Sequence, residues 1–191
     1  MTTMLVILGV IGAYTLFCYF KGREKEMEDT TEEIESVPIV NEKNLNGCPT
    51  RELLMHTLRR IGCEPLVEGD EGAICFDYQG ERFLVESSNE CLFINLYDTW
   101  WYRISMDADI EEFANMQKAV NLINGWASCT ALYTINQEER IIGLHLKKNM
   151  LFVSQIPELE QYLKSTFEDF FKTQRALITE MEKNKVRQKQ M

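Results

Sequence analysis

The first twenty residues of the chain contain no charged side chain, and this feature constrains how the rest of the protein is organised. Residues 4–20 are almost wholly apolar, and Lys21, Arg23 and Lys25 follow directly. At about 1.5 Å per residue, roughly 20 helical residues cross a hydrocarbon core of ~30 Å. The pattern therefore predicts a single-pass transmembrane anchor over residues 1–23, with the remaining chain attached to it as a small domain.

A cleaved secretory signal is the competing interpretation of this segment. Such a signal begins with basic residues and ends with small residues at the cleavage site. Here no Lys or Arg precedes the apolar run, and the bulky Phe17, Tyr19 and Phe20 stand at its end, which favours an uncleaved anchor. Because Lys and Arg are enriched on cytoplasmic flanks, the N-terminus is predicted outside, with membrane contact through residues 1–20. The domain is then expected in the cytoplasm, at the inner (cytoplasmic) membrane of the cell.

The charge distribution predicts an acidic linker and argues against nucleic-acid binding. Residues 24–46 are rich in Glu and bury little, so they are interpreted as a linker. The whole chain carries a net charge of −10, and residues 1–25 contribute +2, which leaves −12 on residues 26–191. An acidic domain repels phosphate backbones, so we expect no nucleic-acid partner. The basic residues of 183–191 are interpreted as a solvated helix tail.

Apolar periodicity divides residues 47–182 into a predicted sequence of helices and strands. The expected order is a helix from Thr50 to Gly62, strands at 64–67, 73–78, 82–86, 91–97 and 100–106, a helix at 107–126, strands at 129–135 and 140–152, and a long last helix with Pro157 in its first turn. Gln79-Gly80 predicts a hairpin turn between two of the strands. Runs of strands joined by short turns indicate an α+β fold with a mainly antiparallel sheet and helices against it.

Three local sequences support a family resemblance. They are Phe76-Asp-Tyr-Gln-Gly-Glu-Arg-Phe83, the helix end Ala119-Val-Asn-Leu-Ile-Asn124, and the helix Leu159–Phe170 after a paired strand. With this order of elements, residues 50–180 resemble the YbjN-type, type III secretion chaperone-like domains of bacteria. The resemblance implies a compact α+β fold, a tendency to dimerise, and a role in binding polypeptide segments or in regulation instead of catalysis.

The residues that usually carry chemistry form no recognisable catalytic or metal-binding pattern. None of the six cysteines makes a Cys-x-x-Cys pair, and the two histidines, His56 and His145, stand apart in sequence. There is no glycine-rich phosphate loop and no nucleophile-elbow motif. Asn121 and Asn124 lie beside a buried stripe, and Asn124-Gly125 is most simply a helix stop. We therefore expect a non-catalytic protein without a cofactor or metal.

Two places are predicted to contact a protein or peptide partner. In a strand, Trp100 and Trp101 point to opposite faces, and tryptophan is enriched at binding hot spots. The alternative is that both faces are covered within the fold. In the last helix, Phe171 and Ile178 add apolar positions beyond one core stripe. A second copy of the chain covering these positions would make a homodimer.

The sequence leaves two function classes. The first is a membrane-tethered interaction module that binds a polypeptide segment and also itself. The second is a small cytoplasmic-side enzyme with an unrecognised active site. A pocket lined by several groups with shifted pKa values would favour the enzyme, whereas an exposed apolar groove or patch would favour the interaction module.

Overall fold

The computed structural model describes residues 47–67, 72–108 and 110–188. The elements in chain order are α2 (Thr50–Arg60), β1 (Leu66–Val67), β2 (Ile74–Tyr78), β3 (Glu81–Glu86), β4 (Phe93–Ser105), α3 (Ile110–Asn124), β5 (Thr130–Asn136), β6 (Ile141–Leu151) and α4 (Leu159–Gln188). Within the described residues, no helix is both long and apolar enough to cross a membrane. The predicted anchor and the acidic linker lie outside the described residues.

The strands form a six-stranded antiparallel sheet in the order β1-β2-β3-β4-β6-β5. This confirms the predicted α+β class and its mainly antiparallel sheet. The turn between β2 and β3 is Gln79-Gly80, and both residues have positive φ angles, 51° and 88°. Two successive residues with positive φ match the right-handed twist of the flanking strands, which explains why this dipeptide makes the hairpin.

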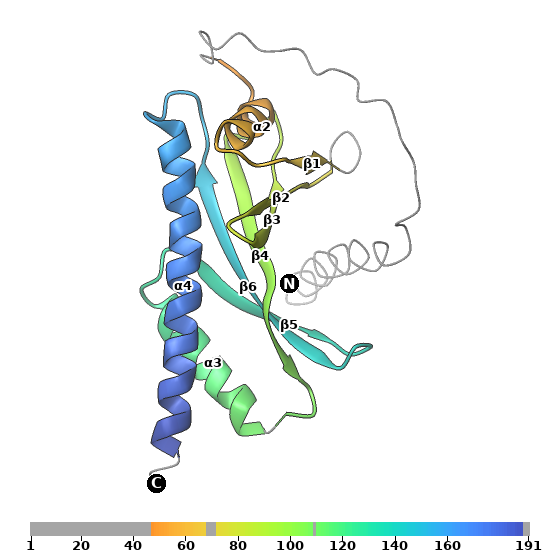
Figure 1. The fold of residues 1–191 in the computed structure, drawn as a ribbon, viewed down its shortest axis with the longest axis vertical. Coiled ribbons are helices and arrows are strands. Elements are labelled where there is room, and N and C mark those ends of the chain that lie inside the picture. Colours follow the sequence, from red (N-terminus) through yellow and green to blue (C-terminus); the bar gives the residue numbers. More distant parts are fainter. Residues whose placement is uncertain (1–46, 68–71, 109, 189–191) are drawn as a thin grey trace, which may run out of the picture. The chain divides into compact units, whose positions relative to one another are not determined.

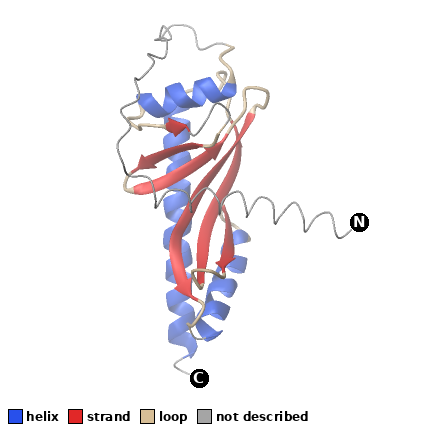
Figure 2. Ribbon diagram, turned by 90° about the vertical axis from the view of Figure 1, so that its right-hand side faces the viewer, coloured by secondary structure: helices blue, strands red, loops and turns tan. Residues whose placement is uncertain are grey.

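The helices of the domain enclose the core with the sheet (Figure 1). The long helix α4 runs beside the sheet, with α3 next to its C-terminal half and α2 near its N-terminal end (Figures 1 and 2). Ion pairs mark both junctions, Arg60 with Glu160 at 2.7 Å and Lys185 with Glu112 at 3.0 Å. The largest fully buried side chains include Phe83, Phe152, Phe167, Phe170, Leu53, Leu58 and Met116.

The last helix follows its predicted apolar periodicity but differs from the prediction at two points. It begins at Leu159 instead of at Pro157 because Glu158 has a left-handed φ of 49° and cannot belong to a right-handed helix. Phe171, predicted to lie on a spare apolar face, is buried against the rings of Tyr78 and Phe83. The β2–β3 hairpin widens the core on this side, so α4 buries more of its surface than a single stripe.

The chain between Cys91 and Met106 also differs from the prediction. Two strands with a break at Asp98 are expected, but the structure has one continuous strand, β4, with an irregularity after Asp98. Asp98 lies opposite Leu146 and Tyr102 lies opposite Leu144, so β4 advances four residues while β6 advances two. The extra residues form a β-bulge that keeps both halves of the strand in the same sheet.

Candidate interaction surface

On one side of the bulge, Trp100 is fixed by a buried histidine. The backbone N–H of Trp100 donates to Nδ1 of His145 at 3.1 Å, so His145 Nε2 carries the proton and donates to Thr134 Oγ1 at 2.7 Å. Burial and then the Arg103 charge lower the pKa of His145 to about 4, which keeps the ring neutral. The ring of Trp100 lies on Gly143, where an added Cβ would come within 2.1 Å of its Cε3 atom.

On the other side of the bulge, Asp98 is buried under α4. Only 1% of Asp98 is exposed, and its Oδ2 accepts a hydrogen bond from Nε2 of Gln174 at 2.5 Å. Its Oδ1 has no hydrogen-bond partner among the described residues. Burial, and then the charge of Glu81, raise the pKa of Asp98 to about 7. The carboxyl group of Asp98 is therefore buried, and its one hydrogen bond among the described residues comes from Gln174 of α4.

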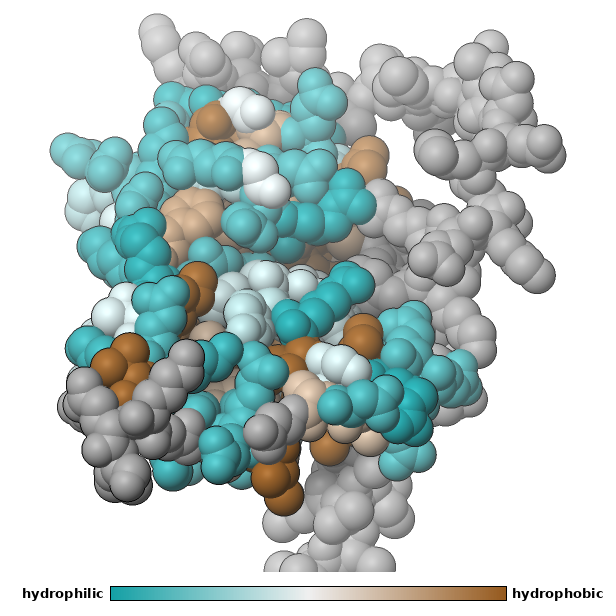
Figure 3. Space-filling model, turned by 60° about the horizontal axis from the view of Figure 1, so that its bottom comes forward, coloured by the Kyte–Doolittle hydropathy of each residue, from teal (hydrophilic) through white to brown (hydrophobic). Residues whose placement is uncertain are grey.

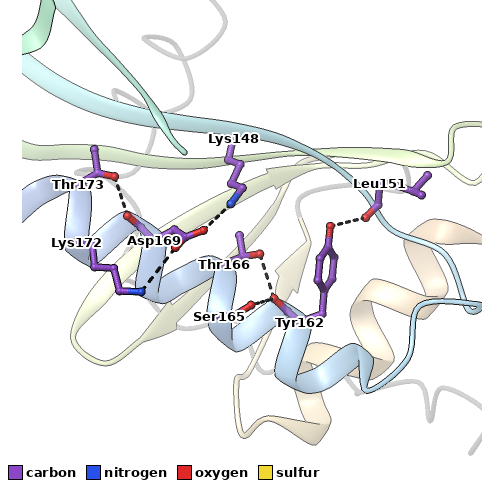
Figure 4. Close-up of polar contacts among 8 residues, drawn as sticks. All are labelled: Lys148, Leu151, Tyr162, Ser165, Thr166, Asp169, Lys172 and Thr173. Atoms are coloured by element: carbon purple, nitrogen blue, oxygen red, sulfur yellow. Dashed lines mark hydrogen bonds and ion pairs between the residues drawn. The ribbon is translucent and has the colours of Figure 1, made fainter. Parts of the chain in front are cut away.

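Side chains of α4 contact the part of β6 that extends beyond its pairing with β5. The pairing of β5 with β6 ends at Thr130 and Lys147, so residues 148–151 extend beyond it. Lys148 forms an ion pair with Asp169 at 2.8 Å, and the hydroxyl of Tyr162 donates to the carbonyl of Leu151 at 3.4 Å (Figure 4). Because Tyr162 occupies the carbonyl of Leu151, this backbone acceptor is not free for an added strand.

A groove between α3 and α4 exposes apolar side chains. Its volume is about 420 Å³, and it is lined by Leu122, Ile123, Trp126, Arg175, Ala176, Thr179, Glu180 and Lys183. Leu122 is 52% exposed and Trp126 is 66% exposed, although both are large apolar residues. Seen from the end where α4 finishes, exposed apolar side chains form separate patches among hydrophilic ones (Figure 3). The groove is the place where two such side chains line one hollow.

The local structure after α3 explains why Trp126 is held at this groove. The side chain of Asn124 closes the helix with two hydrogen bonds to Ala131. Its Nδ2 donates to the Ala131 carbonyl at 2.9 Å, and its Oδ1 accepts from the Ala131 backbone N–H at 2.7 Å. The N–H groups of Trp126 and Ala127 then donate to the carbonyl of Ile123. Asn124 therefore acts as the helix stop that the sequence indicates, and it fixes the turn that carries Trp126.

The rim of the groove carries three charged side chains that differ in their pairing. Lys183 lies 3.6 Å from Glu180 on the same helix. Arg175 is exposed and makes no ion pair with any residue that the structure describes. The groove thus combines an apolar lining with a guanidinium group that has no acidic partner among the described residues.

The predicted partner-contact residues have different environments. Trp100 and Trp101 are both half-buried, and Trp101 packs against Tyr102 and the core. Phe171 lies in the core, whereas Ile178 is 39% exposed on α4 but does not line the groove. Sequence reasoning missed Leu122 and Trp126, although their spacing of four residues in the predicted helix at 107–126 is the signal of a second apolar edge beside the buried stripe.

A second hollow lies between α2 and the start of α4 and is mostly polar. It has a volume of about 520 Å³, and the charged residues on it are Arg60, Glu158, Glu160 and Lys164. Arg60 and Glu160 already pair across it. Asp98 and His145, whose pKa values are strongly displaced, line neither hollow. Among the described residues, no three His, Cys, Asp or Glu side chains are placed to hold a metal ion.

Comparisons with known proteins give little further information. No family model matches the chain, and no curated protein matches it. Among solved structures, the chain is similar to the crystal structure of an uncharacterized protein from Methanothermobacter thermautotrophicus. The two share 9% sequence identity with a TM-score of 0.47, over 70% of this chain and 97% of that chain. A likeness at this level carries no argument about function.

Proposed function

We propose that this chain is a membrane-tethered, non-catalytic module that binds a polypeptide segment in the α3–α4 groove. The observation that carries the proposal is the exposure of Leu122 and Trp126 in one hollow. Exposed large apolar side chains that share a groove are typical of binding surfaces, and tryptophan contributes strongly to such interfaces. Nearby apolar residues of α3, such as Met116 and Ile123, are buried in the core, so the two exposed side chains remain available to a partner.

The arrangement of titratable groups supports binding over catalysis. Active sites bring groups with displaced pKa values together in a hollow. Here the bulge places Asp98 under α4 and attaches His145 to Trp100 and Thr134. Each group has a structural contact, and neither lines one of the two hollows described above. Asp98 and His145 therefore serve the fold, and the groove serves binding.

The proposed anchor at residues 1–20 gives the binding function a membrane context. The uncharged run followed by Lys21, Arg23 and Lys25 supports a single pass, with the domain on the cytoplasmic side of the inner membrane. Confinement to a membrane plane raises effective concentration, so a weak interface is well populated. The resemblance to YbjN-type, type III secretion chaperone-like domains supports a polypeptide partner and allows a second copy to be that partner.

Cysteine labelling tests both the occupancy of the groove and the side of the membrane. The two variants are Leu122→Cys in the groove and Ile110→Cys at the other end of α3, where the side chain is 81% exposed and outside the groove. Both are made with the exposed Cys91 replaced by serine. We expect an impermeant maleimide to label neither site in intact cells. In opened membranes it should label position 110 quickly and position 122 several times more slowly, whereas the purified protein should label at both.

Labelling and a separate alkaline carbonate extraction test different parts of the proposal. Labelling of intact cells from outside would contradict a cytoplasmic domain. Recovery of the protein in the soluble fraction after alkaline carbonate would contradict an integral anchor. Equal labelling rates at both positions in opened membranes would mean that no partner occupies the groove there, which would contradict the binding function.

A further inference from the structure

We propose that the segment bound in the α3–α4 groove is an amphipathic helix that carries a carboxylate beside its apolar anchor, and that Arg175 binds this carboxylate. The inference rests on the proposed function and names the chemistry of the partner. It commits to a helix with an acidic side chain beside its anchor, and a helix with a basic or an uncharged side chain there is an outcome that the test separates from it.

The shape of the groove favours a helical partner. Its walls are α3 and α4, which run in opposite directions, because Glu112 near the start of α3 pairs with Lys185 near the end of α4. A groove between two antiparallel helices accepts a third helix that places anchors at intervals of three and four residues. An extended partner would instead need a free strand edge, and none of the residues that line the groove belongs to a strand.

The rim of the groove favours an acidic side chain on that helix. The nearby cations Lys183 and Lys185 already pair with Glu180 and Glu112. Arg175 makes no such pair with a described residue, although the chain carries a net charge of −10. Arginine binds a carboxylate through two parallel hydrogen bonds, and this geometry adds specificity as well as affinity.

The acidity of the whole domain makes the position of this carboxylate selective. A partner with many acidic groups is repelled by residues 26–191, which carry −12. A single carboxylate that meets Arg175 avoids this penalty, whereas the same group beside Glu180, which also lines the groove, meets a like charge. Opposite charge at one point and like charge around it is a common way to fix the register of a bound helix.

A display selection on the full chain in lipid nanodiscs tests the inference. The probe is a library of amphipathic helices of about four turns, with an apolar face and with the flanking positions varied among Glu, Lys, Gln and Ser. Selected peptides are then measured against the wild type, Arg175→Glu, Leu122→Glu and the control Lys172→Glu. Lys172 lies on the same helix and is exposed, but it does not line the groove.

The inference expects enrichment of peptides with Glu beside the apolar anchor. Their affinity should fall about tenfold or more with Arg175→Glu and change little with Lys172→Glu, and Arg175→Glu should itself select peptides with Lys at that position. Peptides that lose binding with Leu122→Glu but are indifferent to Arg175→Glu would overturn the inference and leave the proposed function standing. If no selected peptide is sensitive to Leu122→Glu, both the inference and the proposed function are contradicted.

Discussion

Asp98→Asn is expected to stabilise the domain by about 2–3 kcal/mol at pH 8 and to bring no stabilisation at pH 4. The folded state raises the pKa of Asp98 from 3.8 to about 7, which corresponds to about 4 kcal/mol of unfavourable burial of the anion above pH 7. Asparagine removes this charge and still accepts the bond from Gln174. Its amide group takes the place of Oδ1, which has no described partner, and this offsets about 1–2 kcal/mol of the gain.

The sign of this effect follows from proton binding. Between pH 3.8 and 7 the folded state holds the Asp98 proton more tightly than the unfolded state, so stability falls as pH rises through this window. His145 acts in the opposite direction: its folded pKa of about 4 lies below the ordinary 6.5, so its contribution is lost as pH falls from 6.5 to 4. The two effects oppose each other in the wild type, and Asp98→Asn should leave the His145 dependence alone.

Urea unfolding of residues 43–191, followed by circular dichroism from pH 4 to pH 8, measures this prediction. Residues 43–191 form a compact unit by themselves. Asp107→Asn is the control, because Asp107 is exposed and pairs with Arg140 at the surface. A loss of stability at pH 8 in Asp98→Asn would mean that the buried carboxylate is ionised and favourable, contrary to the burial described above.

Phe167→Ala is expected to lower the free energy of unfolding by about 3–5 kcal/mol. The ring of Phe167 is fully buried and lies 5.6 Å from Phe76, 4.5 Å from Tyr78 and 5.0 Å from Phe83 between ring centroids. Its removal leaves a cavity where α4 meets the β2–β3 hairpin, and the surrounding rings cannot fill this cavity without moving strands. The loss should be nearly independent of pH, unlike the effect of Asp98→Asn.

Phe93→Ala is the matched control for this cavity. Phe93 is the same residue type, but about half of its surface is exposed, and it pairs with the exposed Leu151 on β6. We expect a loss of no more than about 1 kcal/mol, because little apolar area returns to water. Similar losses for both variants, measured by urea unfolding at pH 7, would show that the core does not lie between α4 and the β2–β3 hairpin.

The order and type of the elements follow from local patterns, so they are predictable from sequence. Alternation in Ile74–Tyr78 and the intervals between Leu163, Phe167 and Phe170 report strand and helix directly. The bulge at Asp98 is different, because a polar residue in a strand pattern is equally consistent with a break. The strand β4 stays continuous because it pairs with β6 on both sides of the bulge. The hydrogen bond between Trp100 and His145 joins residues 45 positions apart, so a local sequence pattern does not reveal it.

The candidate site depends still more on tertiary structure. Phe171 and Ile178 have similar sequence surroundings, yet only Phe171 is buried, because the β2–β3 hairpin lies on its side of α4. The spacing of Leu122 and Trp126 indicates a second apolar edge, but it does not show what lies beside that edge. Its environment is created by α4 residues about fifty positions later in the chain, such as Arg175 and Thr179. A groove of this kind becomes visible only when the two helices are placed together.

Photocrosslinking from the groove in intact cells tests the central claim most directly. A photoreactive phenylalanine analogue replaces Leu122 in the full chain, and the control carries it at Ile110, which is exposed outside the groove. The account predicts a discrete polypeptide adduct from position 122, identified by mass spectrometry as a second copy or as another protein, and a much weaker adduct from position 110. The absence of any polypeptide adduct from position 122, or the same adducts from both positions, would contradict the claim that the groove binds a polypeptide.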